Sequence, residues 1–249
     1  MLWRASSWFN IGSIDFISNL LGSLQRVKSM ARSQSQSAIR NPITYIFGVD
    51  SNVAVLRELV RHGGALSSAD IRRRSGVSKS SVRIGLIVLE QLGLVRSEGS
   101  HVTRLHRFNQ GSDLAEQISE LFHAEANRFT SIIEIIRGCA EHKSNQIRSV
   151  WIYGSVARKE DRPGSDLDIA MLVEIGEVSQ VIEAVRENLR EPAERFGFVP
   201  NLVGLDLGDV ARLVKINDPW WTSLANDAVV VMGERPETVQ AQAEQWSDG

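Results

Sequence analysis

Two aspartates open an otherwise apolar run in the second half of this 249-residue chain. Asp166 and Asp168 begin the segment DLDIAMLVE, whose other residues have the composition of a buried strand. Residues two apart on a strand point to the same face, with their backbones about 6.5 Å apart, so the two carboxylates are expected to lie together. Unit charges about 6 Å apart repel by roughly 3 kcal/mol at an effective dielectric of about 20. A bound Mg²⁺ or Mn²⁺ ion would remove that cost, so the pair is predicted to bind a divalent metal.

The residues just upstream are of types that bind phosphate. The apolar segment RSVWIY leads into Gly154 and Ser155, where a short helix is expected over 155–159. Free backbone N–H groups at a helix start favour an anion, and glycine permits its close approach. Ser155 adds a hydroxyl, and Arg158, one turn on, could contact the same phosphates or brace the acidic strand. We therefore predict that Gly154, Ser155 and Arg158 form a nucleotide-binding set.

The order and spacing of these groups resemble those of a known enzyme family. The segment GSVARKEDRPGSDLDIAMLV resembles the signature of the minimal nucleotidyltransferases of the polymerase-β-like superfamily, and the resemblance covers about residues 148–233. It implies that a nucleoside monophosphate passes from an NTP to an acceptor hydroxyl or similar group while pyrophosphate leaves. It also implies that Asp166 and Asp168 are catalytic metal ligands and that Gly154 and Ser155 hold the triphosphate. Some members are antitoxins that modify a partner protein, so a protein or a small molecule could be the acceptor.

The chain departs from this family at the third carboxylate, which members usually carry on a later strand. The natural alignment of FVPNLVGLDL puts Asn201 at that position, and an amide is a poor metal ligand and no base. Asp206 has the opposite strand parity and could substitute only if Pro200 or Gly204 introduced a bulge. Two alternatives stay open. Either the site turns over, or it binds nucleotide and metal without chemistry and senses nucleotide for the rest of the chain.

A basic segment precedes these elements. The chain has a formal net charge of -2, yet residues 67–108 hold eight Lys or Arg against three Asp or Glu. Apolar periodicity predicts helices from Asn52 to Gly63, from Ser68 to Gly76 and from Ser78 to Gly93, followed by a hairpin of LVRS and HVTRLHRF. A basic three-helix unit with a hairpin is suited to binding a nucleic acid.

This segment resembles a second family. LSSADIRRRSGVSKSSVRIGLIVLEQLGLVRSEG is similar to winged helix-turn-helix domains of bacterial transcription regulators, and the resemblance covers about residues 52–109. It implies that the helix after Ser78 enters the major groove of double-stranded DNA. The predicted DNA-binding residues are Arg72, Arg73, Lys79, Ser80, Arg83 and Arg104. Alternatively, the arginines form a solvated face and the fold serves protein interactions.

These patterns divide the chain into five parts. They are an N-terminal extension and linker (1–45), a winged helix-turn-helix (46–110), a connector helix (111–145), a nucleotidyltransferase domain (146–235) and a polar tail (236–249). The fold class is α/β (α+β), with a mixed sheet flanked by helices in the C-terminal part. A short amphipathic helix is expected over 14–27 of the extension. The apolar stripe of the connector could be a homodimer seam or could pack on the chain's own domains.

Composition excludes several other classes of protein. The single cysteine, Cys139, rules out an intramolecular disulfide, and the five histidines show no zinc-ligand spacing. No segment approaches the roughly 18 consecutive apolar residues of a membrane span, so we expect no membrane partner and a cytoplasmic location. The expected partners are double-stranded DNA, an NTP with Mg²⁺ or Mn²⁺, a protein acceptor and a second copy of the chain.

Overall fold

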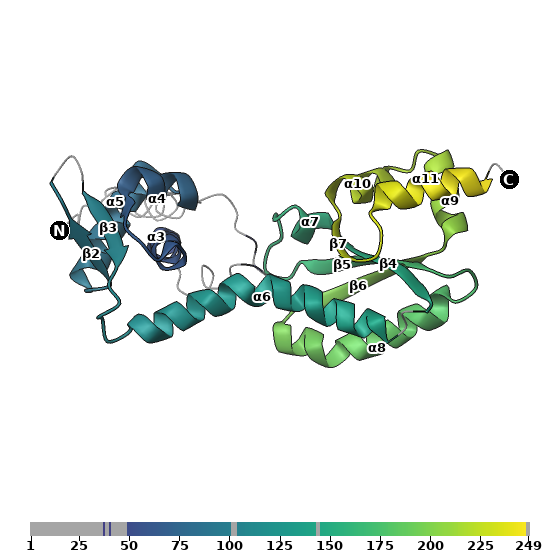
Figure 1. Ribbon diagram of the computed structural model, residues 1–249, viewed down its shortest axis with the longest axis horizontal. Coiled ribbons are helices and arrows are strands. Elements are labelled where there is room, and N and C mark those ends of the chain that lie inside the picture. Colours follow the sequence, from purple (N-terminus) through teal and green to yellow (C-terminus); the bar gives the residue numbers. More distant parts are fainter. Residues whose placement is uncertain (1–36, 38–39, 41–48, 101–103, 143–144, 248–249) are drawn as a thin grey trace, which may run out of the picture.

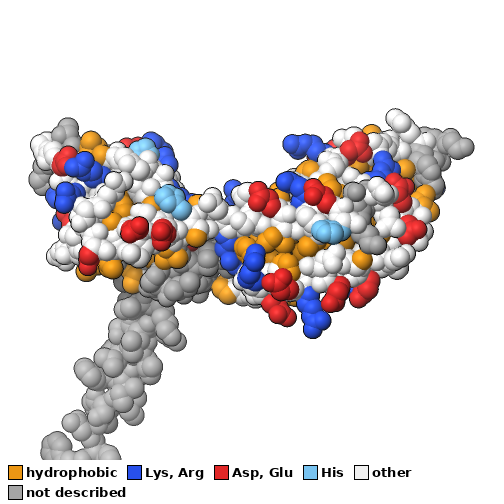
Figure 2. Space-filling view, turned by 60° about the horizontal axis from the view of Figure 1, so that its bottom comes forward, with side chains coloured by type: hydrophobic (Ala, Val, Ile, Leu, Met, Phe, Trp, Pro, Cys, Tyr) orange, Lys and Arg blue, Asp and Glu red, His pale blue; other side chains and the backbone are white. Residues whose placement is uncertain are grey.

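The chain folds into two lobes that one long helix joins (Figure 1). The computed structural model describes residues 37, 40, 49–100, 104–142 and 145–247. The amphipathic helix expected over 14–27 lies outside these residues. Among the helices that are described, none has the length and apolar character needed to cross a membrane. On the face that Figure 2 shows, charged side chains of both signs are mixed over both lobes.

The first lobe is a three-helix unit with a small antiparallel sheet. Its elements are α3 (Asp50–His62), β1 (Leu66–Ser67), α4 (Ser68–Ser75), α5 (Lys79–Gln91), β2 (Val95–Glu98) and β3 (Leu105–Phe108). The sheet order is β1-β3-β2, and β2 and β3 form the expected hairpin, or wing. Strand β1 is not evident in the sequence because two residues cannot show an alternating pattern. The lobe is the predicted winged helix-turn-helix.

Local signals position the two helices of the expected DNA-reading pair. The Ser67 side chain accepts a hydrogen bond from a first-turn N–H of α4, and Gly76 ends that helix in the left-handed conformation. Ser78 caps α5 in the same way. Helix α5 lies close to α3, since a Cβ on Gly85 would stand 3.2 Å from Asn52 Oδ1. One face of α5 is therefore fixed against α3, and the opposite face is left outside.

The connector helix α6 (Ala115–Glu141) belongs to the cores of both lobes. Ala115 and Phe122 are buried in the core of the first lobe, whereas Ile132 and Ile136 are fully buried beneath the sheet of the second. These members of the apolar stripe pack on the chain's own domains, which is one of the two roles that the sequence allows. A homodimer contact through α6 would therefore have to use the exposed residues of this helix.

A buried ion pair fixes the first lobe to the connector. Arg57 of α3 donates to Glu125 of α6 from Nε at 2.6 Å and from Nη2 at 3.0 Å, and the two side chains are 4% and 1% exposed. The Arg57 guanidinium also lies 5.8 Å from the centre of the Phe122 ring. A bidentate pair has a defined geometry, so it holds α3 in one orientation on α6.

The second lobe is a mixed four-stranded sheet between two layers of helices. Its elements are β4 (Ile147–Tyr153), α7 (Gly154–Ala157), β5 (Asp166–Val173), α8 (Val178–Phe196), β6 (Val199–Leu205), α9 (Leu207–Lys215), α10 (Pro219–Asp227), β7 (Val229–Met232) and α11 (Pro236–Ser247). The sheet order is β6-β5-β4-β7, with β5 parallel to β6 and antiparallel to β4. Helices α6 and α8 cover one face, and α9, α10 and α11 cover the other (Figure 1). This is the mixed sheet with flanking helices that the sequence predicts.

Strand β5 is the centre of this lobe and is covered on both faces. Leu167 and Ile169 are buried in the core beneath α6 and α8, while Ala170 and Leu172 are buried in the core on the other face. Burial on both faces explains why the strand is apolar without alternation. Asp168 has the strand parity of Ala170, so its side chain starts on the face that α9, α10 and α11 cover.

The C-terminal segment differs from the expectation of a polar tail over 236–249. Residues Pro236–Ser247 form helix α11, in which Val239 and Ala243 are fully buried in the core on the α9 side of the sheet. Gln240 accepts a hydrogen bond from Trp221 Nε1 at 3.1 Å. The expectation is wrong because two small apolar side chains four residues apart are enough to dock a helix on an existing core, although its composition is polar.

Candidate functional site

The acid pair lies at one edge of the second sheet, where two strands and a short helix meet. Tyr153, the last residue of β4, pairs with Asp168 of β5, and Asp168 pairs with Asn201 of β6. The chain passes from β4 directly into α7, so Gly154 lies beside Asp168. Gly154 has a φ of 73°, and a Cβ there would overlap the Asp168 carboxylate. The approach of these two residues therefore requires glycine at position 154.

The two carboxylates differ in their surroundings. Asp168 is half-buried, and its Oδ1 accepts a hydrogen bond from Asn201 Nδ2 at 2.9 Å. Asp166 begins the strand and is exposed, and none of the described residues pairs with its side chain. Since residues two apart on β5 share a face, the two acids open to the same side of the sheet. No arginine of the described residues neutralises either one.

Asn201 occupies the place of a third acid, and Asp206 does not replace it. The pairing of β5 with β6 runs without a bulge from Asp166 and Val199 to Leu172 and Leu205. Asp206 therefore lies past the partner of Leu172, about 16 Å along the strand from Asp168. There it caps α9 and accepts a hydrogen bond from the Asp209 N–H at 2.8 Å. The bulge at Pro200 or Gly204 that a substitution would need is absent from this strand pair.

Ser155 and Arg158 both lie at α7, but Arg158 is already bonded to two carboxylates and is not available to a phosphate. Ser155 is the second residue of this helix and follows Gly154. Arg158 donates to Glu160 at 2.9 Å and to Asp227, at the end of α10, at 3.1 Å. Its bonds to Glu160 and then to Asp227 raise the pKa of the Arg158 guanidinium. Arg158 thus braces α10, not the acidic strand.

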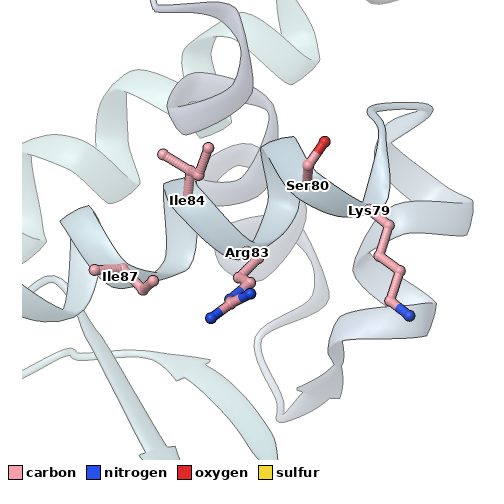
Figure 3. A pocket seen from close by; sticks show the side chains of 5 residues that line it. All are labelled: Lys79, Ser80, Arg83, Ile84 and Ile87. Atoms are coloured by element: carbon pink, nitrogen blue, oxygen red, sulfur yellow. The ribbon is translucent and has the colours of Figure 1, made fainter.

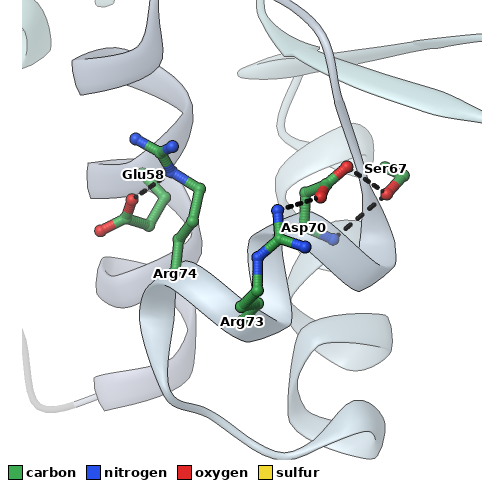
Figure 4. A network of polar contacts seen from close by, with 5 residues as sticks. All are labelled: Glu58, Ser67, Asp70, Arg73 and Arg74. Atoms are coloured by element: carbon green, nitrogen blue, oxygen red, sulfur yellow. Dashed lines mark hydrogen bonds and ion pairs between the residues drawn. The ribbon is translucent and has the colours of Figure 1, made fainter.

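The basic segment of the first lobe is partly neutralised by its own acids. Arg73 is bonded to Asp70 at 2.6 Å, and Arg74 is bonded to Glu58 at 3.1 Å (Figure 4). Arg104, at the wing, donates to Glu90 of α5 at 3.0 Å. By contrast, none of the described carboxylates pairs with the predicted DNA-binding residues Arg72, Lys79 and Arg83. The unpaired cations among the predicted DNA-binding residues therefore lie on α4 and α5.

The outer face of α5 presents side chains of three kinds. Lys79, Ser80, Arg83, Ile84 and Ile87 line a shallow hollow on this helix (Figure 3). The first turn of α5 contains no acidic residue. Its N-terminal N–H groups and the two cations consequently make this face attractive to an anion. Sequence reasoning places Lys79, Ser80 and Arg83 here but does not single out the two isoleucines.

Two family models match the chain, one in each lobe. The model for polymerase beta nucleotidyltransferases matches residues 134–199, and the model for the MarR family matches residues 50–103. The chain joins a MarR-type winged helix to a polymerase β-type nucleotidyltransferase domain. The match to the nucleotidyltransferases ends two residues before Asn201, so the departure at the third acid lies just beyond it.

Solved structures show a distant likeness to about half of the chain. A toxin–antitoxin crystal structure with AMP-PNP is 13% identical with a TM-score of 0.34, and the alignment covers 47% of this chain and 86% of that chain. A mutant of the toxin–antitoxin MntA-HpeT is 12% identical with a TM-score of 0.33, over 47% of this chain and 86% of that chain. Likeness at this level establishes no shared activity. No curated protein matches the sequence.

The donor set of the nucleotidyltransferase domain suits a metal ion that also binds a nucleotide. Mg²⁺ usually takes one or two carboxylates and completes its shell with water and phosphate oxygens. Asp166 and Asp168 supply two carboxylates, while Asn201 turns its amide nitrogen towards Asp168. In the described part of the chain, no cluster of three or more His, Cys, Asp or Glu side chains could hold a metal. The residues fit an ion shared with a triphosphate better than one held by protein ligands alone.

Tyr153 and Trp220 place two aromatic rings in contact beside this edge of the nucleotidyltransferase domain. Their ring centres are 5.5 Å apart in an edge-on contact. Burial raises the pKa of the Tyr153 hydroxyl, a hydrogen bond with Trp220 opposes that effect, and the charge of Asp168 adds to it. Trp221, in contrast, is buried against Trp151 at 6.2 Å. Of the adjacent Trp220 and Trp221, only Trp220 therefore lies near the sheet edge that carries Asp166 and Asp168, the acidic edge.

One residue that contacts α7 is not indicated by the sequence. Arg40, which lies ahead of the winged helix, donates from Nη1 to the Val156 carbonyl of α7, and its guanidinium lies 3.6 Å from the centre of the Phe129 ring. Burial lowers the pKa of Arg40, and the charge of Asp161 opposes that effect. Figure 1 shows α7 on the side of its lobe that faces the winged helix. A lone arginine in a Ser/Gln-rich tract carries no pattern, so its docking on α7 is a purely tertiary feature.

Proposed function

We propose that this chain is a Mg²⁺-dependent nucleotidyltransferase coupled to DNA binding by its winged helix. The reaction would transfer a nucleoside monophosphate from an NTP to a hydroxyl or similar group of a partner protein or a small molecule. The observation that carries the proposal is the meeting of Gly154 with Asp168 at the open edge of the sheet. A glycine forced against a carboxylate, next to a second unpaired carboxylate, has no evident structural purpose.

Each residue at the edge would have a separate task. Gly154 lets a phosphate approach the backbone, and Ser155 would donate its hydroxyl to a phosphate oxygen. Asp166 and Asp168 would hold Mg²⁺ or Mn²⁺, which when bound withdraws negative charge from the triphosphate. Arg158 would have to exchange Glu160 or Asp227 for phosphate, so we assign it a weaker contribution than the sequence suggests.

Asn201 favours a second candidate function, that of a nucleotide-sensing regulator. An amide cannot take a proton from an acceptor hydroxyl, and Asn201 donates to Asp168, whereas a third carboxylate would add another metal ligand. The domain would then bind metal and NTP with little or no turnover. Bound nucleotide would change DNA affinity only if it bound two conformations of the chain unequally. Helix α6, which belongs to the cores of both lobes, offers one route between them.

Labelled nucleotides distinguish the two candidates. The full chain is incubated with α-labelled NTPs and Mg²⁺ or Mn²⁺, and both pyrophosphate release and label on protein are measured. Transfer that Asp166→Asn and Asp168→Asn abolish supports the enzyme. Nucleotide binding without transfer, together with transfer gained by Asn201→Asp, supports the sensor. Glu183→Gln, an exposed change on α8, is the control, and absence of nucleotide binding with either metal contradicts both candidates.

The winged helix is proposed to bind double-stranded DNA with α5 in the major groove. Arg72, Lys79 and Arg83 would meet phosphates first, because they give up no intramolecular ion pair. Arg73 and Arg104 would have to leave Asp70 and Glu90. A homodimer that reads two half-sites, and a cytoplasmic location with access to DNA and NTP, are parts of this proposal.

Salt dependence tests the DNA half of the proposal. Each phosphate contact should add about 0.9 to the negative slope of log K against log salt concentration. Three contacts therefore predict a slope of about -3 per winged helix, measured by fluorescence anisotropy with the chain's own upstream DNA. Affinity that stays unchanged between low and moderate salt would instead indicate a protein-interaction module.

A further inference from the structure

Two isoleucines stand on the outer face of α5 without a role in the core. Ile84 is 59% exposed and Ile87 is 45% exposed. The buried face of the same helix consists of Val82, Leu86 and Leu89. Each side chain keeps about half of its apolar surface exposed, and a partner that covered this face would remove that surface from water.

The charges around these isoleucines identify the kind of surface that fits them. Ile84 and Ile87 share one hollow with Lys79, Ser80 and Arg83 (Figure 3). None of the described carboxylates pairs with either cation. An apolar protein partner would have to bury both cations, which is costly without matching acids. DNA offers phosphates to the cations and an apolar group on the floor of its major groove, namely the methyl group of thymine.

We propose that Ile84 and Ile87 are specificity-determining residues that read thymine methyl groups in the major groove. This inference rests on the proposed DNA binding and adds a base preference to it. Isoleucine has no hydrogen-bonding group, so it cannot read the donors and acceptors that mark the other bases. The thymine methyl is the one apolar feature of the major groove, and burying it against isoleucine removes apolar surface from water.

The spacing of the two residues sets the spacing of the bases. Positions three apart on a helix are separated by about 4.5 Å along its axis. Successive base pairs are separated by about 3.4 Å, so the two side chains reach neighbouring base pairs. The preferred site should therefore contain a step of two adjacent A·T pairs at the centre of the α5 footprint, with thymine on either strand.

Replacing thymine with deoxyuridine tests this directly. The full-length chain is first used to select duplexes from a random library, and every thymine in the best site is then replaced singly. Deoxyuridine keeps the Watson–Crick pair and loses only the methyl group. Two adjacent positions should each lose affinity by about fourfold, the value of one buried methyl group. Replacement of any other thymine should reduce the affinity less.

Variants of the protein test whether Ile84 and Ile87 carry this preference for thymine. Ile84→Ala and Ile87→Ala should each lose the preference for thymine at one of the two positions. A duplex with thymine at that position and a duplex with deoxyuridine there should then bind equally well. Alanine favours helix, so both variants should keep the melting temperature of the parent. Ile175→Ala, which changes an isoleucine of the second lobe that is 62% exposed, should keep the full preference for thymine.

The outcomes separate this inference from the DNA binding on which it rests. Selected duplexes that bind equally with thymine and deoxyuridine overturn the reading of methyl groups and leave DNA binding intact. A preference for thymine that survives both alanine changes overturns the assignment to Ile84 and Ile87. Failure to enrich any duplex overturns DNA binding and this inference together.

Discussion

The two lobes present their candidate functional side chains in opposite ways. In the winged helix, they stand on the outer face of α5, whose own cap and buried face fix it. In the nucleotidyltransferase domain, they converge from β4, β5 and β6 at the edge of a sheet. The first arrangement depends on residues within one short segment, and the second depends on strand register. A change in one strand therefore threatens the whole acidic edge, whereas α5 tolerates changes to single outward side chains.

The two lobes also differ in whether their charged side chains are paired with opposite charges. Several arginines of the winged helix are paired with nearby acids, such as Arg73 with Asp70 and Arg104 with Glu90. At the acidic edge, none of the described residues brings a cation to Asp166 or Asp168. Like charges held together without a partner cost stability unless a ligand compensates them. This contrast makes the acidic edge the stronger indication of a ligand site.

The largest expected effect comes from the link between the lobes. Glu125→Ala should lower the free energy of unfolding by about 3 to 5 kcal/mol, because it leaves the buried Arg57 charge without its carboxylate. Urea denaturation followed by circular dichroism measures the loss. Glu58→Ala, which breaks the more exposed pair with Arg74, should cost about 0 to 1 kcal/mol. Equal losses from the two changes would contradict a special role of the buried pair.

The next effect should fall on nucleotide binding. Gly154→Ala places a Cβ against the Asp168 carboxylate and should weaken binding of a non-hydrolysable NTP by more than about tenfold. Isothermal titration calorimetry in Mg²⁺ measures the affinity. The control is Gly164→Ala, because Gly164 also has a positive φ, of 88°, but has no atom within 4 Å of the added Cβ. If both variants bind alike, backbone strain explains the result and the carboxylate does not.

A smaller effect should separate paired from unpaired arginines in the winged helix. Arg83→Ala should reduce affinity for duplex DNA by about tenfold and lower the salt slope by about one. Arg73→Ala should reduce affinity less, since Arg73 must break its bond to Asp70 before it can meet a phosphate. Fluorescence anisotropy over a series of salt concentrations measures both quantities. A greater loss from Arg73→Ala would reverse the proposed order of contacts.

The smallest expected effect is a pH dependence of the winged helix. His106 is buried on β3, where it contacts Ser97 and Ser68 and lies near Glu90. Burial lowers the pKa of His106, the charge of Glu90 opposes this, and the charge of Arg104 adds to it. The unfolded chain therefore binds a proton more readily, so stability is fully present above about pH 6.5 and declines as the pH falls below that value.

Thermal melting between pH 5 and pH 7.5 tests this expectation. His106→Gln should melt with less dependence on pH than the parent, because glutamine keeps polar contacts and does not titrate. His62→Gln alters an exposed histidine of α3 and should leave the dependence unchanged. A parent protein that is as stable at pH 5.5 as at pH 7.5 would contradict the assignment.

Much of the fold follows from patterns within short segments. Serine caps with apolar stripes predict α4 and α5, and the apolar run after Asp168 predicts a central strand. Strand β1 and the docking of α11 could not be predicted, because two residues show no period and a polar helix gives no sign of the core that receives it. The division into a winged helix and a nucleotidyltransferase domain was therefore accessible from sequence, and the packing of the chain's end was not.

The sequence by itself indicated both candidate sets: Gly154 with the two aspartates, and the cations around α5. Each set is a local sequence motif, and backbone geometry over a few residues fixes which of its side chains share a face. Only the tertiary structure decided that Asn201 takes the third position while Asp206 caps a helix, that Arg40 contacts α7, and that Arg73 and Arg104 are paired. These outcomes depend on strand register and on contacts between distant segments, which short-range patterns do not encode.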